Sequence, residues 1–149
     1  MFSKSKGFTL IEVILVLAII IAMVVLSIPF YQSFQIRTQL SNTSQEITQT
    51  LRYSQSKAMA IEDYSNFGLH FESDKYVLFR GNSYNPTDSY NEVYDLVETL
   101  SISVNLNGGG NDIIFDRLKG STSNYGTVTI TSVNNESKII TVNSLGKIE

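Results

Sequence analysis

The feature that most constrains this chain is an uncharged apolar run near its N-terminus. From Val13 to Ile28 there is no charged residue, and almost every residue is Val, Ile, Leu, Ala or Met. The wider apolar stretch extends from Phe8 to Phe30. At 1.5 Å per residue, about 20 helical residues cross a bilayer core of about 30 Å. The sequence therefore predicts a membrane-spanning helix over residues 8–30.

Three kinds of N-terminal segment carry such a run: a cleaved secretory signal, an uncleaved signal anchor and a prepilin-type leader. A secretory signal has a shorter apolar region followed by small residues before the cut, and no such site follows Phe30. Lys4 and Lys6 precede the run, and basic flanks stay on the cytoplasmic side of a membrane. We therefore expect the C-terminal part of the chain to lie outside the cytoplasm.

Glu12 is an acid near the start of this apolar helix. Inside a bilayer such a side chain is unfavourable by a few kcal/mol unless it reaches the headgroups or finds a partner. One interpretation places Glu12 near the headgroups, where it also favours the positive N-terminus of the helix. The other gives it an opposite charge on a neighbouring molecule.

Residues 6–12, Lys-Gly-Phe-Thr-Leu-Ile-Glu, resemble the type III signal of type IV pilins and pseudopilins. The resemblance implies that a prepilin peptidase cleaves after Gly7 and that the new N-terminal residue, Phe8, is N-methylated. It also implies that Glu12 acts in assembly and subunit register, and that Pro29 kinks the helix, as a residue without a backbone N–H does. A free α-amine within reach of a neighbour's Glu12 would relieve the desolvation of that acid.

The helical pattern continues beyond the apolar run, to about Tyr64. Apolar and small residues recur at spacings of three and four, at Ile36, Leu40, Thr43, Ile47, Leu51, Ser54, Ala58 and Ile61. A helix from Phe8 to Tyr64 would be about 85 Å long, far longer than a small β domain. We therefore expect lipid or neighbouring helices to cover its first half, and a sheet of the same chain to cover its second half.

From Asn66 onward, strand-like and turn-like segments alternate. The expected strands are Phe67–Phe71, Lys75–Arg80, one or two within Val93–Leu106, Ile113–Phe115, Thr127–Val133 and Lys138–Val142. The predicted class is α+β, with one long helix packed on one or two antiparallel sheets. The predicted divisions are a leader (1–7), a transmembrane or filament-core helix (8–30), an amphipathic helix (31–64) and an antiparallel β domain (65–149).

The C-terminal region adds a second resemblance. Ile114–Asp116 followed by Leu118–Gly120, then two strands and a closing Leu145–Ile148, is similar to the GspH/FimT group of minor pseudopilins and minor pilins. The resemblance implies a structural subunit of a type II secretion pseudopilus or type IV pilus, and not an enzyme. Its implied partners are other pilin or pseudopilin subunits, the prepilin peptidase, an inner-membrane assembly platform and membrane lipid. Its implied location is the bacterial cytoplasmic membrane, and then a filament in the envelope or at the surface.

Binding of DNA or another ligand at the filament tip is an alternative function, since some FimT-type minor pilins bind DNA through a C-terminal Gly-Arg-x-Arg motif. This chain has Gly146-Lys147-Ile148-Glu149 there, so an acid replaces the second arginine and would repel phosphate. The remaining candidates for weak DNA or anion contact are Arg117, Lys119, Lys138 and Lys147, and several acids accompany them. A membrane-anchored β domain unrelated to filaments is the third interpretation.

The sequence nominates no catalytic residue, metal or cofactor. The chain has no Cys, which excludes thiolate chemistry and disulfides. His70 is the only histidine and lies in an expected strand without an evident nucleophile, so a structural role is expected. The segment Asn107–Asp112 lacks the alternating acids and terminal glutamate of a calcium loop, and is expected to be a polar turn. The aromatic loop Ser83–Tyr94 either contacts a neighbouring subunit or has no partner.

Overall fold

The computed structural model describes residues 7–149, apart from the side chain of Ser27. The chain divides into two units, with the boundary between Gln35 and Ile36. Helix α1 (Leu10–Met59) contributes to both units and is continuous through Pro29. Of the predicted leader, residues 1–6 lie outside the described residues.

Helix α1 begins at Leu10, two residues later than predicted, because Thr9 caps it. The backbone N–H of Glu12 donates to the Thr9 hydroxyl oxygen at 3.3 Å. A Ser or Thr at this position satisfies one of the amide groups that a helix N-terminus leaves without a partner. The Thr-x-x-Glu spacing is that of a capping box. The start of the helix is therefore fixed by local sequence.

Helix α1 ends at Met59, earlier than the predicted end near Tyr64. The backbone turns at Ile61, whose φ of 59° is left-handed, a conformation that β-branched residues rarely adopt. A short 3₁₀ helix, η1 (Glu62–Tyr64), follows. The apolar spacing continues through Ile61, so sequence periodicity alone does not reveal this turn.

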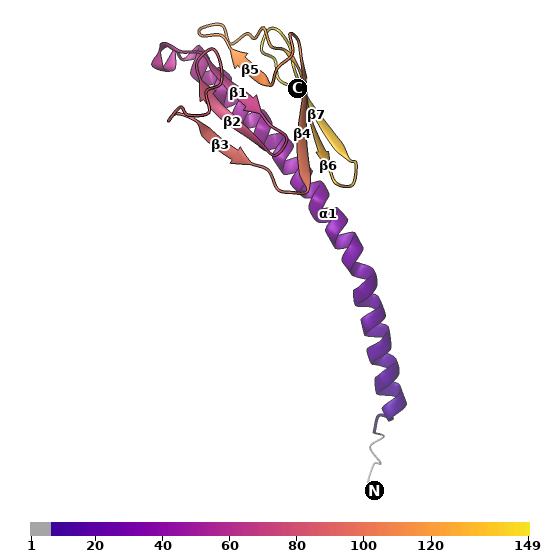
Figure 1. Ribbon diagram of the computed structural model, residues 1–149. Coiled ribbons are helices and arrows are strands. Elements are labelled where there is room, and N and C mark those ends of the chain that lie inside the picture. The colour runs from indigo at the N-terminus through magenta and orange to yellow at the C-terminus, as the bar shows by residue number, and fades with distance from the viewer. Residues whose placement is uncertain (1–6) are drawn as a thin grey trace. The chain divides into compact units, whose positions relative to one another are not determined.

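Two antiparallel sheets complete the second unit (Figure 1). The first contains β1 (Phe67–Phe71), β2 (Lys75–Arg80), β3 (Glu92–Asp95) and β5 (Asp112–Phe115), in the order β3-β2-β1-β5. The second contains β4 (Leu100–Leu106), β6 (Gly126–Ser132) and β7 (Ser137–Val142), in the order β4-β6-β7. The predicted α+β class with antiparallel sheets is confirmed.

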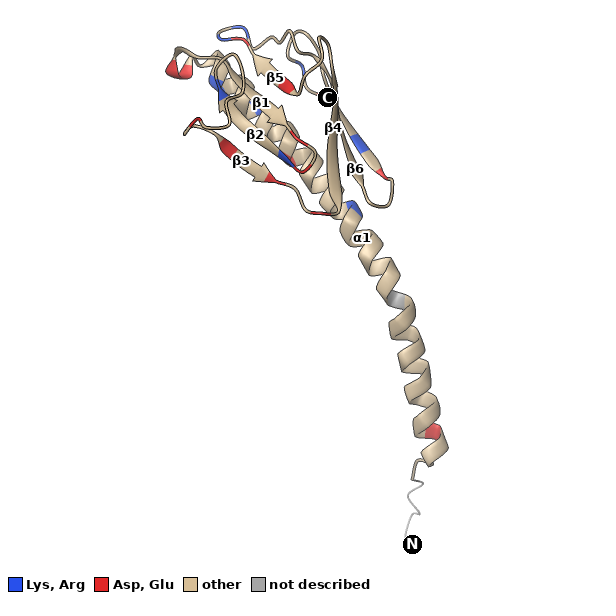
Figure 2. Cartoon of the chain, viewed as in Figure 1, with Lys and Arg blue, Asp and Glu red and all other residues tan. Residues whose placement is uncertain are grey.

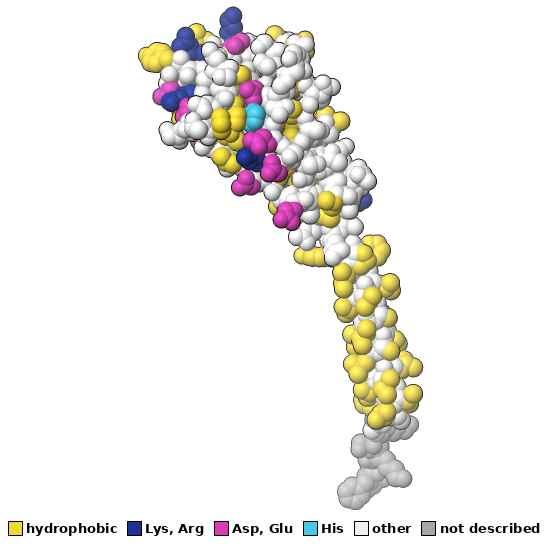
Figure 3. All heavy atoms as spheres, in the orientation of Figure 1, with side chains coloured by type: hydrophobic (Ala, Val, Ile, Leu, Met, Phe, Trp, Pro, Cys, Tyr) yellow, Lys and Arg dark blue, Asp and Glu magenta, His cyan; other side chains and the backbone are white. Residues whose placement is uncertain are grey.

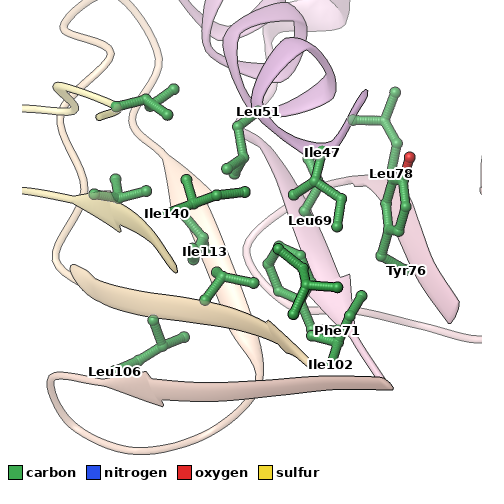
Figure 4. Packing of buried hydrophobic residues seen from close by; sticks show 14 of the residues in the cluster. Ile47, Leu51, Leu69, Phe71, Tyr76, Leu78, Ile102, Leu106, Ile113 and Ile140 are labelled. Atoms are coloured by element: carbon green, nitrogen blue, oxygen red, sulfur yellow. The ribbon is translucent and has the colours of Figure 1, made fainter. Parts of the chain in front are cut away.

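The core of the second unit lies between α1 and the two sheets. Ile47 and Leu51 of α1 are fully buried and point toward side chains from both sheets, including Leu69 and Ile140 (Figure 4). Burying each such side chain stabilises the fold by roughly 1.5–3 kcal/mol relative to leaving it exposed. All the residues of the core cluster belong to the unit Ile36–Glu149.

Strand β4 alternates as the sequence predicts, whereas β1 and β2 are buried at nearly every position. In β4 the side chains of Leu100, Ile102 and Leu106 are buried, whereas Ser101 and Ser103 are exposed. A sheet that covers the core on one face and meets water on the other requires this period of two. The polar face of the second sheet is therefore its outer face.

Candidate assembly surface on the N-terminal helix

The first unit presents a continuous apolar surface. Every side chain described from Gly7 to Gln35 is exposed, and Figure 3 shows hydrophobic atoms along the visible face of this helix segment. Ile21 is 62% exposed and Phe30 is 78% exposed. Helix α1 contains a stretch long and apolar enough to cross a membrane. Apolar surfaces of this extent mark sites of contact with lipid or with other proteins.

Glu12 is the only charged residue of this unit between Leu10 and Gln35 (Figure 2). It lies in the first turn of α1, where the helix dipole favours a negative charge. The side chains around it form a shallow apolar depression of about 270 Å³, lined by Phe8, Glu12, Val13, Val16 and Leu17. A carboxylate in such a setting favours a cationic partner supplied from elsewhere.

Aromatic side chains follow Pro29 at the other end of the apolar run. Phe30, Tyr31 and Phe34 are 78%, 69% and 68% exposed. Aromatic rings are enriched where a membrane-spanning helix meets the water interface. The polar residues Gln32 and Gln35 alternate with them. The described part of this unit thus combines an acid, an apolar span and an aromatic belt in chain order.

The four cations predicted for weak DNA or anion contact lie on three segments of the second unit. Arg117 and Lys119 follow β5 and line one open polar cavity. Lys138 lies on β7, where it is paired with Ile130 of β6. Lys147 lies near the C-terminus and forms an ion pair with Glu149. The segments that carry Lys119 and Lys147 lie side by side, because Gln55 donates to the carbonyl oxygens of both Gly120 and Gly146.

His70 lies on β1, as predicted, and its partners are now defined. Its Nδ1 atom lies 2.5 Å from Oδ1 of Asp112, the residue directly opposite it on β5. Its ring stacks on Tyr84 with the centroids 4.0 Å apart. Within residues 7–149, no group of three or more His, Cys, Asp or Glu side chains is arranged to hold a metal ion. His70 joins a strand pair to the loop that carries Tyr84.

A caged lysine on α1 was missed by sequence analysis. The Nζ atom of Lys57 lies 5.0 Å, 5.5 Å and 5.2 Å from the ring centroids of Tyr53, Phe67 and Tyr90. Burial acts to lower the pKa of Lys57, but hydrogen bonds to Glu62 and Tyr90 outweigh it and raise the pKa above its ordinary value. Together with Tyr84, this contact holds the connection between β2 and β3 against α1 and β1. The loop expected over Ser83–Tyr94 ends earlier than predicted, because β3 begins at Glu92. Phe67 lies on β1 and Tyr90 between β2 and β3, so no local pattern in α1 could identify them as partners of Lys57.

The architecture defines the class of fold. A long N-terminal helix packs through its second part on antiparallel β sheets, which is an α+β arrangement. No protein-family profile matches this sequence, and no curated protein sequence matches it.

Among solved structures, the fold is similar to that of the minor pseudopilin EpsH from the type 2 secretion system of Vibrio cholerae. The two chains are 14% identical, with a TM-score of 0.55, over 74% of this chain and 94% of that chain. The predicted type IV pilin-like, pseudopilin fold is therefore confirmed. The more specific resemblance to the GspH/FimT group stays a prediction.

Proposed function

We propose that this chain is a structural subunit of a pilin-like filament, inserted in the membrane before assembly, and that it catalyses no reaction. The observation that carries the proposal is the exposed apolar surface of the first unit, with Glu12 as its only charge from Leu10 to Gln35. Lipid covers this surface in the membrane, and neighbouring N-terminal helices replace the lipid in the filament. The similarity of the fold to a minor pseudopilin supports this proposal.

Processing by a prepilin peptidase creates the mature N-terminus. In the proposal the enzyme cuts between Gly7 and Phe8, and Phe8 is then N-methylated. Both residues are exposed and precede the first residue of α1, Leu10, so the scissile bond lies outside the helix. The freed α-amine pairs with Glu12 of a neighbouring subunit and sets the register between subunits, because an unpaired acid in an apolar core is costly.

The proposed location follows from the order of features along α1. Residues 8–30 span the cytoplasmic membrane, with the aromatic residues after Pro29 at its outer interface, and the β domain lies outside the cytoplasm. An inner-membrane assembly platform then inserts the subunit into a filament of the cell envelope or cell surface. As EpsH is a minor pseudopilin, we further propose a minor subunit that initiates or primes the filament of a type II secretion system or type IV pilus.

The mass of the mature N-terminus tests this proposal. In the native host we expect the chain to begin at Phe8 and to carry one added methyl group. A Gly7→Val variant should keep its leader and stay in the membrane fraction, which separates insertion from processing. A wild-type chain that retains Met1 in the native host would contradict the proposal and favour a membrane-anchored β domain.

A second candidate function is capture of DNA at the filament tip. The shared cavity of Arg117 and Lys119 favours it, whereas the ion pair of Lys147 with Glu149 weakens the basic surface that a DNA duplex needs. Gel shifts with residues 31–149 at low salt test it. Absence of a shifted band there would eliminate this alternative.

A further inference from the structure

Three loops of the second unit meet at one end of the first sheet. Phe67, the first residue of β1, is paired with Arg80, the last residue of β2, and with Phe115, the last residue of β5. The segments that precede β1 and follow β2 and β5 therefore leave the sheet side by side. They enclose an open cavity of about 640 Å³. Its polar and aromatic lining includes Tyr64, Asn66, Asn82, Arg117 and Lys119.

Hydrogen bonds hold these loops in place around the cavity. The backbone N–H of Arg117 donates to Oδ1 of Asn66 at 2.8 Å, and Nη1 of Arg117 donates to the carbonyl oxygen of Tyr64 at 2.7 Å. The Nδ2 atom of Asn66 donates to Oδ1 of Asn82 at 2.8 Å. The guanidinium is thus oriented before any ligand arrives, which reduces the entropy lost on binding.

At this end of the sheet the acidic side chains have polar partners, whereas two basic side chains have no carboxylate partner. Asp63 is paired with Arg80 at 3.0 Å, and the Asp116 carboxylate, which also lines the cavity, accepts a hydrogen bond from the Ser121 hydroxyl at 3.0 Å. No carboxylate of residues 7–149 lies within ion-pair distance of Arg117 or Lys119. The guanidinium has five N–H donors, and the carbonyl oxygen of Tyr64 accepts from Nη1 alone.

The backbone around the cavity is strained. Tyr64 and Leu118, which line the cavity, have positive φ, a conformation that costs a side-chain-bearing residue about 1–3 kcal/mol. Ile61 and Asp63, in the turn that precedes Tyr64, have positive φ as well. Such residues cluster at sites where a ligand or partner binds. Tyr64 is 82% exposed, so its ring is free to lie against a bound group.

We infer that this cavity is an anion-binding site that receives a phosphate or carboxylate group between Arg117 and Lys119. A planar guanidinium and an ammonium group suit both kinds of oxyanion, and the volume falls within the usual range for small-ligand sites. The Tyr64 ring contacts the portion of the ligand to which the phosphate or carboxylate group is attached. This inference is independent of filament assembly.

A single tryptophan provides the measurement. The chain contains no Trp, so a Tyr64→Trp variant of the full-length protein in detergent micelles carries one fluorophore at the cavity. Inorganic phosphate and citrate are titrated separately, against sodium chloride at matched ionic strength. We expect a saturable change in fluorescence with at least one of the two anions and none with chloride. The anion that binds more tightly identifies the group as phosphate or carboxylate.

Two further variants separate binding from folding. The Lys119 side chain has no hydrogen bond or ion pair among the described residues, so Lys119→Gln should not unfold the protein. It should weaken binding of the anion about fivefold, a change of about 1 kcal/mol. Lys138→Gln removes an equal charge on β7 and should have no effect. The inference would be overturned if phosphate and citrate changed the fluorescence no more than chloride does. It would also be overturned if Lys119→Gln and Lys138→Gln weakened anion binding equally.

Discussion

The ammonium group of Lys57 lies 2.7 Å from Oε1 of Glu62. Lys57 occupies the last turn of α1, and Glu62 begins the short helix after it, so this pair ties the end of the helix to the turn. The same ammonium donates to the Tyr90 hydroxyl at 2.5 Å. One side chain therefore joins the helix, the turn and the loop between β2 and β3 that carries Tyr90.

Replacing Lys57 by Met should destabilise the second unit by about 2 kcal/mol, because a charge-assisted hydrogen bond and cation–π contacts are lost together. The measurement is urea denaturation of residues 36–149, which contain the whole core cluster. Arg52→Met, on the exposed side of the same helix, is the matched control and should change stability by less than about 0.5 kcal/mol. Equal effects of the two substitutions would refute a specific role for the cage.

The Lys57 contribution should also depend on pH in one direction. Because folding raises the pKa of Lys57, its stabilisation is fully present below the unfolded-state pKa of about 10.4 and is lost as pH rises through the folded-state pKa. The difference in the free energy of unfolding between the wild type and Lys57→Met should therefore be constant from about pH 6 to pH 9. It should shrink as the pH rises above about 10.4.

Measuring the difference between the two proteins is necessary, because burial raises the pKa of Tyr76 as well. An acid whose pKa is raised by folding destabilises the native state at alkaline pH, and it does so in both proteins. Thermal melts across this range provide the check. A difference that disappears already near neutral pH would contradict the assignment.

The apolar stripe of α1 makes a sharper stability prediction. Ile47 is fully buried, whereas Ile139 on β7 is 60% exposed. Truncating a buried Ile to Ala removes its transfer free energy and leaves a cavity, at a cost of about 2–5 kcal/mol. We expect this loss for Ile47→Ala and less than about 0.5 kcal/mol for Ile139→Ala, in urea denaturation of residues 36–149. Similar losses at both positions would mean that the core lies elsewhere.

Local patterns in the sequence predicted most of the elements. The period of two in β4 and the spacing of three and four in α1 each depend on one element facing one core, so Ile102 and Ile47 are recognisable without a structure. The end of α1 was predicted too late, because the turn at Ile61 uses a β-branched residue in a left-handed conformation. No glycine marks that turn.

The sites of the β domain depend on strand register, which the sequence does not encode locally. Asp112 was expected in a turn, but it begins β5 opposite His70. Arg117 and Tyr64 meet only because β1 pairs with β5. By contrast, Glu12 and its apolar surroundings lie within two helical turns of one another. The candidate assembly surface was therefore predictable, and the cavity at the end of the sheet was not.

Gly146 is a position where only glycine fits. Its φ is +83°, and a Cβ atom there would lie 2.0 Å from the carbonyl oxygen of Gly120. Gly108 has nearly the same φ, +84°, with nothing within 4 Å of such an atom. Gly108→Ala should therefore cost only the conformational strain, about 1–2 kcal/mol. Gly146→Ala should cost at least about 2 kcal/mol more, since the loop must also move.

Gln55 of α1 contacts the same two glycines, Gly120 and Gly146. Its Nε2 atom donates to the carbonyl oxygens of Gly120 at 2.8 Å and Gly146 at 2.9 Å. If Gly146→Ala displaces the loop, the amide protons of residues 145–148 should lose protection from hydrogen exchange. In the Gly108→Ala variant, the same amide protons should keep their wild-type protection. Equal stabilities of the two variants would show that the close approach is not required.

The charge of Glu12, rather than its shape, should determine assembly. Glu12→Gln keeps the size of the side chain and removes the negative charge, so the apolar helix should insert into the membrane at least as well as the wild type. The same variant should be depleted about tenfold or more from the sheared filament fraction, because one lost ion pair in an apolar setting is worth at least about 1.4 kcal/mol. Thr9→Val, which removes the hydroxyl that caps the Glu12 amide, keeps the acid and should affect assembly less. If Glu12→Gln enters filaments as efficiently as the wild type, the acid has no role in subunit register, and the exposed apolar surface alone would have to drive assembly.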